Sequence, residues 1–259
     1  MSQRILIIGN PNCGKSALFN ALTGSSVRVG NWSGVTVNCK TAHLQIDDAV
    51  FECVDLPGIY NLCQSEDSAL DQIAAQRAML TEVDLIVNVC DAANLPRNLY
   101  LTSQLCQLKK PMLLALNMTD IATKHGLNID EKKLSAELGI PVTNIIANRE
   151  IGINELKQQI KQQLQQKTIA QINIELPVQI KKFEPELNNI KSLTSNANQW
   201  FTWAALENDL STEKRLNTIE KNTLTQIKQQ IELESEESSD TWIANARHNW
   251  AHKISKLAT

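Results

Sequence analysis

The residues with the most specific chemistry stand in one short run near the amino terminus, Gly9-Asn10-Pro11-Asn12-Cys13-Gly14-Lys15-Ser16. Its spacing, G-x-x-x-x-G-K-S, lets the backbone turn tightly, so that successive N–H groups point inward at phosphate oxygens. The Lys15 ammonium can reach the two outer phosphates, and the Ser16 hydroxyl is a ligand for Mg²⁺. A strand pattern precedes the run and a helical pattern begins with Ala17, which argues against a chance glycine-rich turn. We therefore predict a nucleoside triphosphate site formed by these eight residues and Ala17.

Two further elements have residue types that suit the γ-phosphate and its metal ion. Asp55-Leu56-Pro57-Gly58 follows a strand pattern, where the acid typically holds Mg²⁺ and the Gly58 N–H can meet the γ-phosphate. Thr36 ends a loop of small and polar residues, 25–36, at the distance from the phosphate loop where GTPases carry a Mg²⁺-binding threonine. Each element is weak alone, because tight turns and loop threonines are common. Together they predict Ser16, Thr36 and Asp55 as Mg²⁺ ligands.

A guanine-specific element is indicated by Asn117-Met118-Thr119-Asp120, which matches N-K-x-D except at the second position. The Asp120 carboxylate can accept hydrogen bonds from N1–H and the 2-amino group of guanine, a pair that adenine lacks. Met118 has an unbranched chain that can pack over the base where lysine usually does. In the loop expected to cover the base, 146–148, only Ala147 matches the usual pattern. The set predicts GTP and GDP as ligands, with Asn117, Met118, Asp120 and Ala147 at the base.

These residues need a scaffold that brings several loops to one edge of a sheet. The strand patterns fall at residues 4–8, 37–46, 49–54, 84–90 and 111–116 and from 141 onward. The two-residue connection at 47–48 predicts an antiparallel hairpin, and the continuously apolar later strands are typical of a parallel sheet. Helical patterns near 70–81, 97–108 and 152–166 alternate with them. We predict an α/β P-loop GTPase fold, with helices flanking a mixed, mostly parallel six-stranded sheet.

The pattern changes beyond Lys167, where strand signals fade and Pro177 opens a series of helical segments. Their expected ranges are 178–194, 197–207, 212–234 and 240–257. We therefore predict two domains, a GTP-binding domain over residues 1–167 and a smaller all-α domain over residues 168–259.

Composition narrows the class of protein. A net charge of −3 gives no reason to expect a basic surface for nucleic acid. The six cysteines form no C-x-x-C pair and are typical of reduced cytosolic thiols. No signal peptide and no apolar run of membrane-spanning length is evident, so we expect a soluble chain.

The motifs together resemble the N-terminal cytosolic region of the bacterial ferrous iron transport protein B family. The resemblance rests on the phosphate loop, the string Val29-Gly30-Asn31-Trp32-Ser33-Gly34-Val35-Thr36-Val37, the run Asp55-Leu56-Pro57-Gly58-Ile59-Tyr60, and the tetrad with Met118. Later segments, 203–207 and 243–247, are similar to the family's helical, GDI-like spacer domain. The resemblance implies a GTPase that regulates or drives ferrous iron uptake at the cytoplasmic face of the inner membrane. Its partners would be the transmembrane region of the same full-length protein and small accessory proteins, with a homo-oligomer left open.

The resemblance also implies a catalytic arrangement. In the family's potassium-activated mechanism, the position of Asn12 and carbonyls near 30–32 hold K⁺ beside the β–γ bridge. Ile59 stands where many small GTPases have a water-orienting glutamine, and an aliphatic side chain cannot take that role. We expect Lys15, Asn12, Thr36 and Gly58 to act in hydrolysis, and the sparse base-covering loop to allow fast GDP release.

Two alternatives remain at this point. A free-standing GTPase of ribosome assembly or tRNA modification is expected to carry a basic RNA-binding appendage, which the carboxyl-terminal part does not resemble. A nucleotide-gated interaction module would bind GTP without significant turnover, and only an activity assay separates it from an enzyme.

Overall fold

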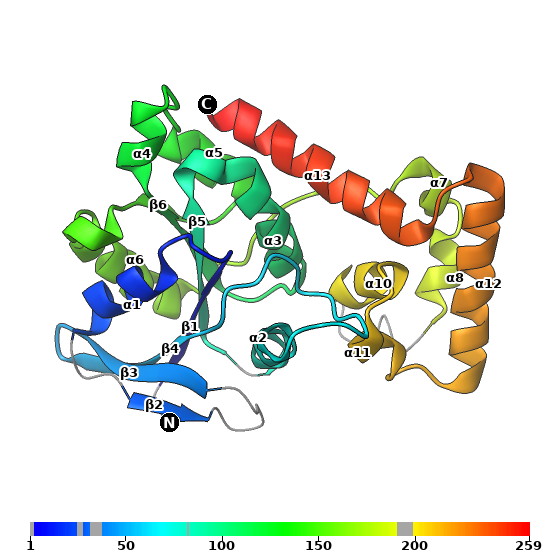
Figure 1. The fold of residues 1–259 in the computed structure, drawn as a ribbon, viewed down its shortest axis with the longest axis horizontal. Coiled ribbons are helices and arrows are strands. Elements are labelled where there is room, and N and C mark those ends of the chain that lie inside the picture. Colours follow the sequence, from blue (N-terminus) through cyan, green and yellow to red (C-terminus); the bar gives the residue numbers. More distant parts are fainter. Residues whose placement is uncertain (1–2, 25–27, 32–37, 82, 191–198) are drawn as a thin grey trace. The chain divides into compact units, whose positions relative to one another are not determined.

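A computed structural model describes residues 3–24, 28–31, 38–81, 83–190 and 199–259. The chain divides into two compact units, and each is described by itself (Figure 1). The first unit comprises Met1–Leu62, Ala69–Ile172 and Ala251–Thr259; the second comprises Cys63–Ser68 and Asn173–Trp250. The boundary predicted after Lys167 stays a prediction.

The first unit is built on a seven-stranded sheet with the order β2-β3-β4-β1-β5-β6-β7. Its strands are β1 Arg4–Gly9, β2 Arg28–Asn31, β3 Asn38–Ile46, β4 Ala49–Asp55, β5 Leu85–Asp91, β6 Met112–Asn117 and β7 Val142–Asn144. The pairs from β4 through β1, β5 and β6 to β7 are parallel, whereas β2–β3 and β3–β4 are antiparallel. The predicted fold class, a mostly parallel sheet flanked by helices, is confirmed.

The central strands carry apolar side chains on both faces because helices cover both sides. Every residue of β6 is buried, as is every residue of β5 except Asp91, which fits parallel strands enclosed between layers of helices. On one face, α1 (Lys15–Thr23) and α6 (Ile153–Gln166) bury apolar residues in one core with the strands. The opposite side is flanked by α2 (Leu70–Leu80) and α3 (Leu95–Gln107), as Figure 1 shows. Two short helices, α4 (Thr119–Lys124) and α5 (Glu131–Leu138), were not predicted.

The hairpin is as expected, since β3 and β4 are joined by Asp47 and Asp48. The prediction of a loop over 25–36 is wrong in part, because this range contains β2, which pairs antiparallel with β3. A four-residue edge strand is held by backbone hydrogen bonds to one neighbour, so its side-chain pattern carries little signal. Thr36 lies outside the described residues.

The second unit is helical, as predicted, but one expected helix is interrupted. Its helices are α7 Val178–Lys181, α8 Glu184–Asn188, α10 Gln199–Leu206, α11 Leu210–Glu213, α12 Thr218–Ser235 and α13 Ser239–Ala258, whose last residues belong to the first unit. The single helix predicted over 178–194 is wrong because Pro185, in the first turn of α8, lacks the N–H that would continue α7. The helix predicted from 212 is divided into α11 and α12, and Asn217 and Glu220 form a capping box at the start of α12. None of the helices in the described ranges is both long and apolar enough to cross a lipid bilayer.

Candidate functional site

The phosphate loop lies between the end of β1 and the start of α1, at the edge of the sheet where the parallel strands end. A Cβ on Gly9 would stand 2.2 Å from the carbonyl oxygen of Val89, and one on Gly14 would stand 2.1 Å from Nδ2 of Asn117. Gly14 also has φ of 90°, a left-handed conformation that glycine adopts without strain. A side chain at position 9 would clash with Val89, and one at position 14 would clash with Asn117 and strain the backbone. Both positions of the motif therefore require glycine.

Lys15 and Ser16 open α1 beside the acid at the end of β4. Lys15 is 8% exposed and donates from Nζ to the carbonyl oxygen of Asn10 at 3.2 Å. The Ser16 hydroxyl donates to Oδ2 of Asp55 at 3.0 Å, while Oδ1 of Asp55 is buried without a partner among the described residues. Burial raises the pKa of Asp55, and the Ser16 hydroxyl and the Lys15 charge partly offset this. A buried carboxylate oxygen without a partner, next to a hydroxyl, fits the oxygen-rich ligand set of Mg²⁺.

The turn that contains Gly58 lies directly on the phosphate loop. The Ile59 N–H donates to the carbonyl oxygen of Gly9 at 3.2 Å. A Cβ on Gly58 would stand 2.7 Å from Lys15 Nζ and 2.9 Å from Pro11 Cα. The structure therefore brings the D-x-x-G element against the lysine of the phosphate loop, where an added side chain would not fit.

Asn117 joins the loops at the other end of the candidate site. Its Nδ2 donates to the carbonyl oxygen of Cys13, and its Oδ1 accepts from the Ala147 N–H, both at 3.0 Å. Met118 follows with φ of 61° and precedes α4, whose first turn contains Asp120. The predicted base-binding residues are thus neighbours, and Asp120 has an ion pair with Arg149.

A hollow of about 140 Å³ adjoins the phosphate loop on the side of α3. Asn10 lines it and donates from Nδ2 to the carbonyl oxygen of Arg97 at 3.3 Å. The Arg97 guanidinium lies over the ring of Tyr60, 4.3 Å from its centroid. Gln104, further along α3, accepts from the Leu62 N–H at 2.8 Å. These contacts fix the chain just after Gly58.

The sequence analysis missed Arg97 and Gln104. Gln104 offers a signal, because it stands three or four residues from Leu101 and Leu108 and next to Leu105, all buried, so it lies on the buried face of α3. A polar side chain at such a position needs a hydrogen-bonding partner. Arg97 is exposed and offers no comparable signal.

Residues Cys63–Ser68, which follow the Gly58 turn in the sequence, belong to the second unit. The Gln64 N–H donates to Oδ1 of Asp209 at 2.7 Å, and the Gln64 carbonyl accepts from the Leu210 N–H at 3.0 Å. Asp209 is fully buried and also caps α11 through the Thr212 N–H. Residues 63–68 are therefore held by the helical unit itself.

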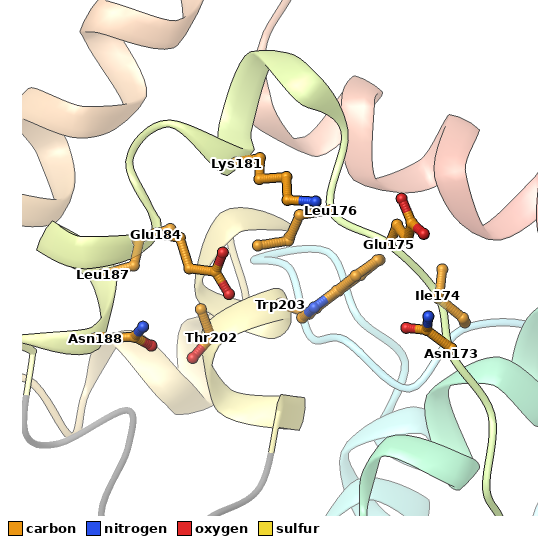
Figure 2. Close-up of a pocket in the computed structure, with 10 residues that line it drawn as sticks. All are labelled: Asn173, Ile174, Glu175, Leu176, Lys181, Glu184, Leu187, Asn188, Thr202 and Trp203. Atoms are coloured by element: carbon orange, nitrogen blue, oxygen red, sulfur yellow. The ribbon is translucent and has the colours of Figure 1, made fainter.

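The second unit also contains a hollow of about 300 Å³ (Figure 2). Lys181 and Glu184 line it together with Thr202 and Trp203 of α10. None of the described residues in the nucleotide motifs lines this hollow, so it has no part in the candidate site.

Comparison with known proteins identifies the family. Residues 3–160 match the sequence profile described as Ferrous iron transport protein B, and residues 174–259 match that of the FeoB cytosolic helical domain. This chain belongs to the ferrous iron transport protein B family. The resemblance stated from the motifs is confirmed, and the membership favours it over a GTPase of ribosome assembly or tRNA modification.

Several relatives in the family have a curated name or a solved structure. The Fe(2+) transporter FeoB of Legionella pneumophila (strain Paris) is 39% identical over 257 residues, 97% of this chain and 33% of that protein. That of Escherichia coli (strain K12) is 42% identical over 214 residues, 79% of this chain and 27% of that protein. The chain thus spans about a third of the length of these curated relatives.

Solved structures of the family share the fold over the whole chain. The cytosolic domain of L. pneumophila FeoB has a TM-score of 0.84 at 36% identity, and the match covers 98% of both chains. A mutant form of S. thermophilus NFeoB bound to mGDP has a TM-score of 0.86 at 30% identity, and the match covers 100% of both chains.

Proposed function

We propose that this chain binds GTP and Mg²⁺, hydrolyses GTP to GDP and phosphate, and forms the cytosolic regulatory part of a ferrous iron transporter. The observation that supports this most is the meeting of two motifs at one edge of the sheet, where Lys15 and Ser16 of the phosphate loop contact Gly58 and Asp55 of the D-x-x-G element. Relatives crystallised with GDP or GMPPNP support the choice of ligand.

In this proposal the chain supplies positive charge and hydrogen-bond donors to the phosphates. Backbone N–H groups of residues 12–17 surround the β-phosphate, and the Lys15 ammonium neutralises charge that develops between the β- and γ-phosphates. The Gly58 N–H contacts the γ-phosphate. Ser16, Thr36 and Asp55 would hold Mg²⁺, which neutralises further phosphate charge when it is bound.

We assign the selection of guanine to the residues predicted to surround the base, Asn117, Met118, Asp120 and Ala147. Asp120 would accept from the N1–H and 2-amino groups, while Asn117 and the Ala147 N–H hold the loops that surround the base. Adenine would leave the Asp120 carboxylate without its donors, which costs binding free energy. Met118 would cover one face of the base.

The chain lacks a side chain that could orient the attacking water at the expected place. Ile59 is apolar and 5% exposed. Charge also develops between the β- and γ-phosphates during hydrolysis. We assign part of the stabilisation of this charge to K⁺ held by Asn12, an exposed phosphate-loop residue with φ of 64°. The same proposal expects fast GDP release, because the loop at Ala147 offers few base-covering side chains.

The test is GTP turnover in KCl and in NaCl at equal ionic strength. Asn12→Gly removes the side chain and keeps the left-handed backbone unstrained, and Asn20→Ala on the exposed side of α1 is the matched control. We expect faster turnover in KCl for wild type and Asn20→Ala, and no salt difference for Asn12→Gly. Equal, very slow turnover in both salts would favour a nucleotide-gated module without enzymatic activity.

The proposed role in iron transport rests on the longer relatives, of which this chain spans about a third. We propose that the partner is a transmembrane iron-transport region of the same full-length protein, at the cytoplasmic face of the bacterial inner membrane. Names of the curated relatives support this assignment.

A further inference from the structure

The carboxylate expected to read guanine already has a partner in the protein. Nη2 of Arg149 lies 3.7 Å from Oδ2 of Asp120. The Asp120 side chain is 21% exposed and that of Arg149 is 58% exposed, so the pair is open to solvent. It is the only ion pair of Asp120 among the described residues.

Arg149 and guanine share the chemistry that a carboxylate recognises. The edge of guanine with N1–H and the 2-amino group consists of two nitrogens on one carbon, each with an N–H directed the same way. A guanidinium group presents the same planar fork of parallel N–H donors. Both therefore suit the two oxygens of one carboxylate, and the two cannot occupy Asp120 together.

The loop that carries Arg149 is held close to Asp120 by its own backbone. The N–H groups of Ile146 and Ile151 each donate to the other residue's carbonyl oxygen, at 3.0 and 3.3 Å. The Arg149 N–H donates to the Ile146 carbonyl at 2.9 Å within the turn Ala147–Arg149. At the far end, a Cβ on Gly152 would stand 2.3 Å from the carbonyl oxygen of Asn144. These contacts hold the backbone of the loop and do not involve the exposed side chain of Arg149.

We propose that Arg149 is an intramolecular competitor of the guanine base for Asp120, and that it thereby weakens GDP binding and speeds GDP release. The inference rests on the proposed binding of guanine nucleotides at this site. When GDP enters, the base displaces the guanidinium into solvent, and when GDP leaves, Arg149 takes the carboxylate back.

The size of the effect follows from the exposure of the pair. A partly exposed ion pair contributes little free energy, so its loss should change the affinity for GDP by about two- to fivefold. The difference should shrink with rising salt, because exposed charges are screened within a Debye length of roughly 10 Å at 0.1 M.

The experiment measures the Kd for GDP and the rate of GDP release for the whole 259-residue chain. The matched control is Arg4→Ala, which removes the same charge from an exposed ion pair with Glu52 at the start of β1. Arg149→Ala is expected to bind GDP about two- to fivefold more tightly and to release it more slowly, while Arg4→Ala stays at the wild-type value. Unchanged or weaker binding by Arg149→Ala would overturn the proposal, since the arginine would then be inert or would cover the base.

A double-mutant cycle separates competition from an indirect effect on the loop. Asp120→Asn removes the charge partner, and its amide can bind xanthosine diphosphate, whose 2-oxo group accepts a hydrogen bond. In that background Arg149→Ala is expected to leave the Kd for xanthosine diphosphate unchanged. A gain as large as in the Asp120 protein would show that Arg149 acts through loop packing and would overturn competition. Failure of the wild-type chain to prefer GDP over ADP overturns the proposed function, whatever the Arg149 variants do.

Discussion

The Ser16 hydroxyl donates a hydrogen bond to one oxygen of the Asp55 carboxylate at 3.0 Å, and the other oxygen is buried without a partner among the described residues. Burial raises the pKa of Asp55 above its usual 3.8. The folded chain therefore holds a proton on Asp55 more tightly than the unfolded chain does, and ionisation of Asp55 at neutral pH costs folding free energy. A site poised to receive a cation has this signature.

The first prediction is a pH-dependent stability difference between wild type and Asp55→Asn. The sign of this difference and its pH range follow from the raised pKa of Asp55. The loss of folding free energy on ionisation of Asp55 is absent below pH 3.8 and complete above the pKa in the folded state. We expect Asp55→Asn to gain most in Tm over wild type at pH 7, and the gain to shrink as pH falls toward 4. Thermal unfolding without and with Mg²⁺ checks this, and Mg²⁺ should raise the Tm of wild type alone. A gain that grows toward acid pH would contradict it.

A second prediction concerns the chain after Gly58. The guanidinium of Arg97 lies over the Tyr60 ring, and an exposed cation–π contact of this kind is worth about 0.5–1 kcal/mol. Arg97→Ala should therefore loosen the Gly58 turn and lower GTP turnover by about two- to fivefold, with GDP affinity unchanged. Tyr60→Phe keeps the ring and should behave as wild type, whereas Tyr60→Leu should behave as Arg97→Ala. Additive loss in the double variant would show that the two side chains act independently.

Local chemistry explains which parts of the site could be predicted from the sequence. The phosphate loop, Asp55 and Asn117 are recognised because each function requires given residue types at a fixed spacing after a strand. The Asp120–Arg149 pair depends on how a short loop bends back on α4, and Arg97 meets Tyr60 only through the packing of α3. Such contacts are set by tertiary structure, so spacing along the chain does not indicate them.

Local chemistry also explains which helices and strands could be predicted from the sequence. Buried parallel strands such as β5 and β6 were predicted because both faces require apolar residues. The edge strand β2 was missed because its pairing rests on backbone hydrogen bonds. The break between α7 and α8 had a signal in Pro185, which the single helix predicted over 178–194 did not take into account.

A third prediction is that the cysteines do not react in the folded protein. All six are buried, and burial raises the pKa of Cys13 to about 11, although the Lys15 charge partly opposes this. At pH 7.5 roughly one Cys13 thiol in 3,000 is then ionised, and the thiolate is the reactive form. We expect no thiol to be labelled by DTNB within minutes under native conditions, and all six after unfolding in guanidinium chloride. Rapid native labelling of Cys13 would instead indicate a redox-sensitive phosphate loop.

The last prediction concerns the core of the helical unit, where Arg247 and Glu207 form an ion pair away from solvent. Their side chains are 0% and 5% exposed, Nη2 of Arg247 lies 2.8 Å from Oε2 of Glu207, and the guanidinium also lies 4.9 Å from the centroid of the Trp203 ring. Arg247→Met leaves a buried carboxylate without its cation, which typically costs about 3–5 kcal/mol. The helical unit should therefore unfold at a lower denaturant concentration, as followed by tryptophan fluorescence.

The double variant tests the origin of that loss. Arg247→Met with Glu207→Leu removes both charges, and we expect it to recover much of the stability, because the cost of the single variant arises from the charge left behind. The matched control is Lys228→Met, which breaks a more exposed pair with Glu213 and should cost under about 1 kcal/mol. If the double variant were as unstable as Arg247→Met alone, the loss would come from packing against Trp203, and the buried charge would not be its cause.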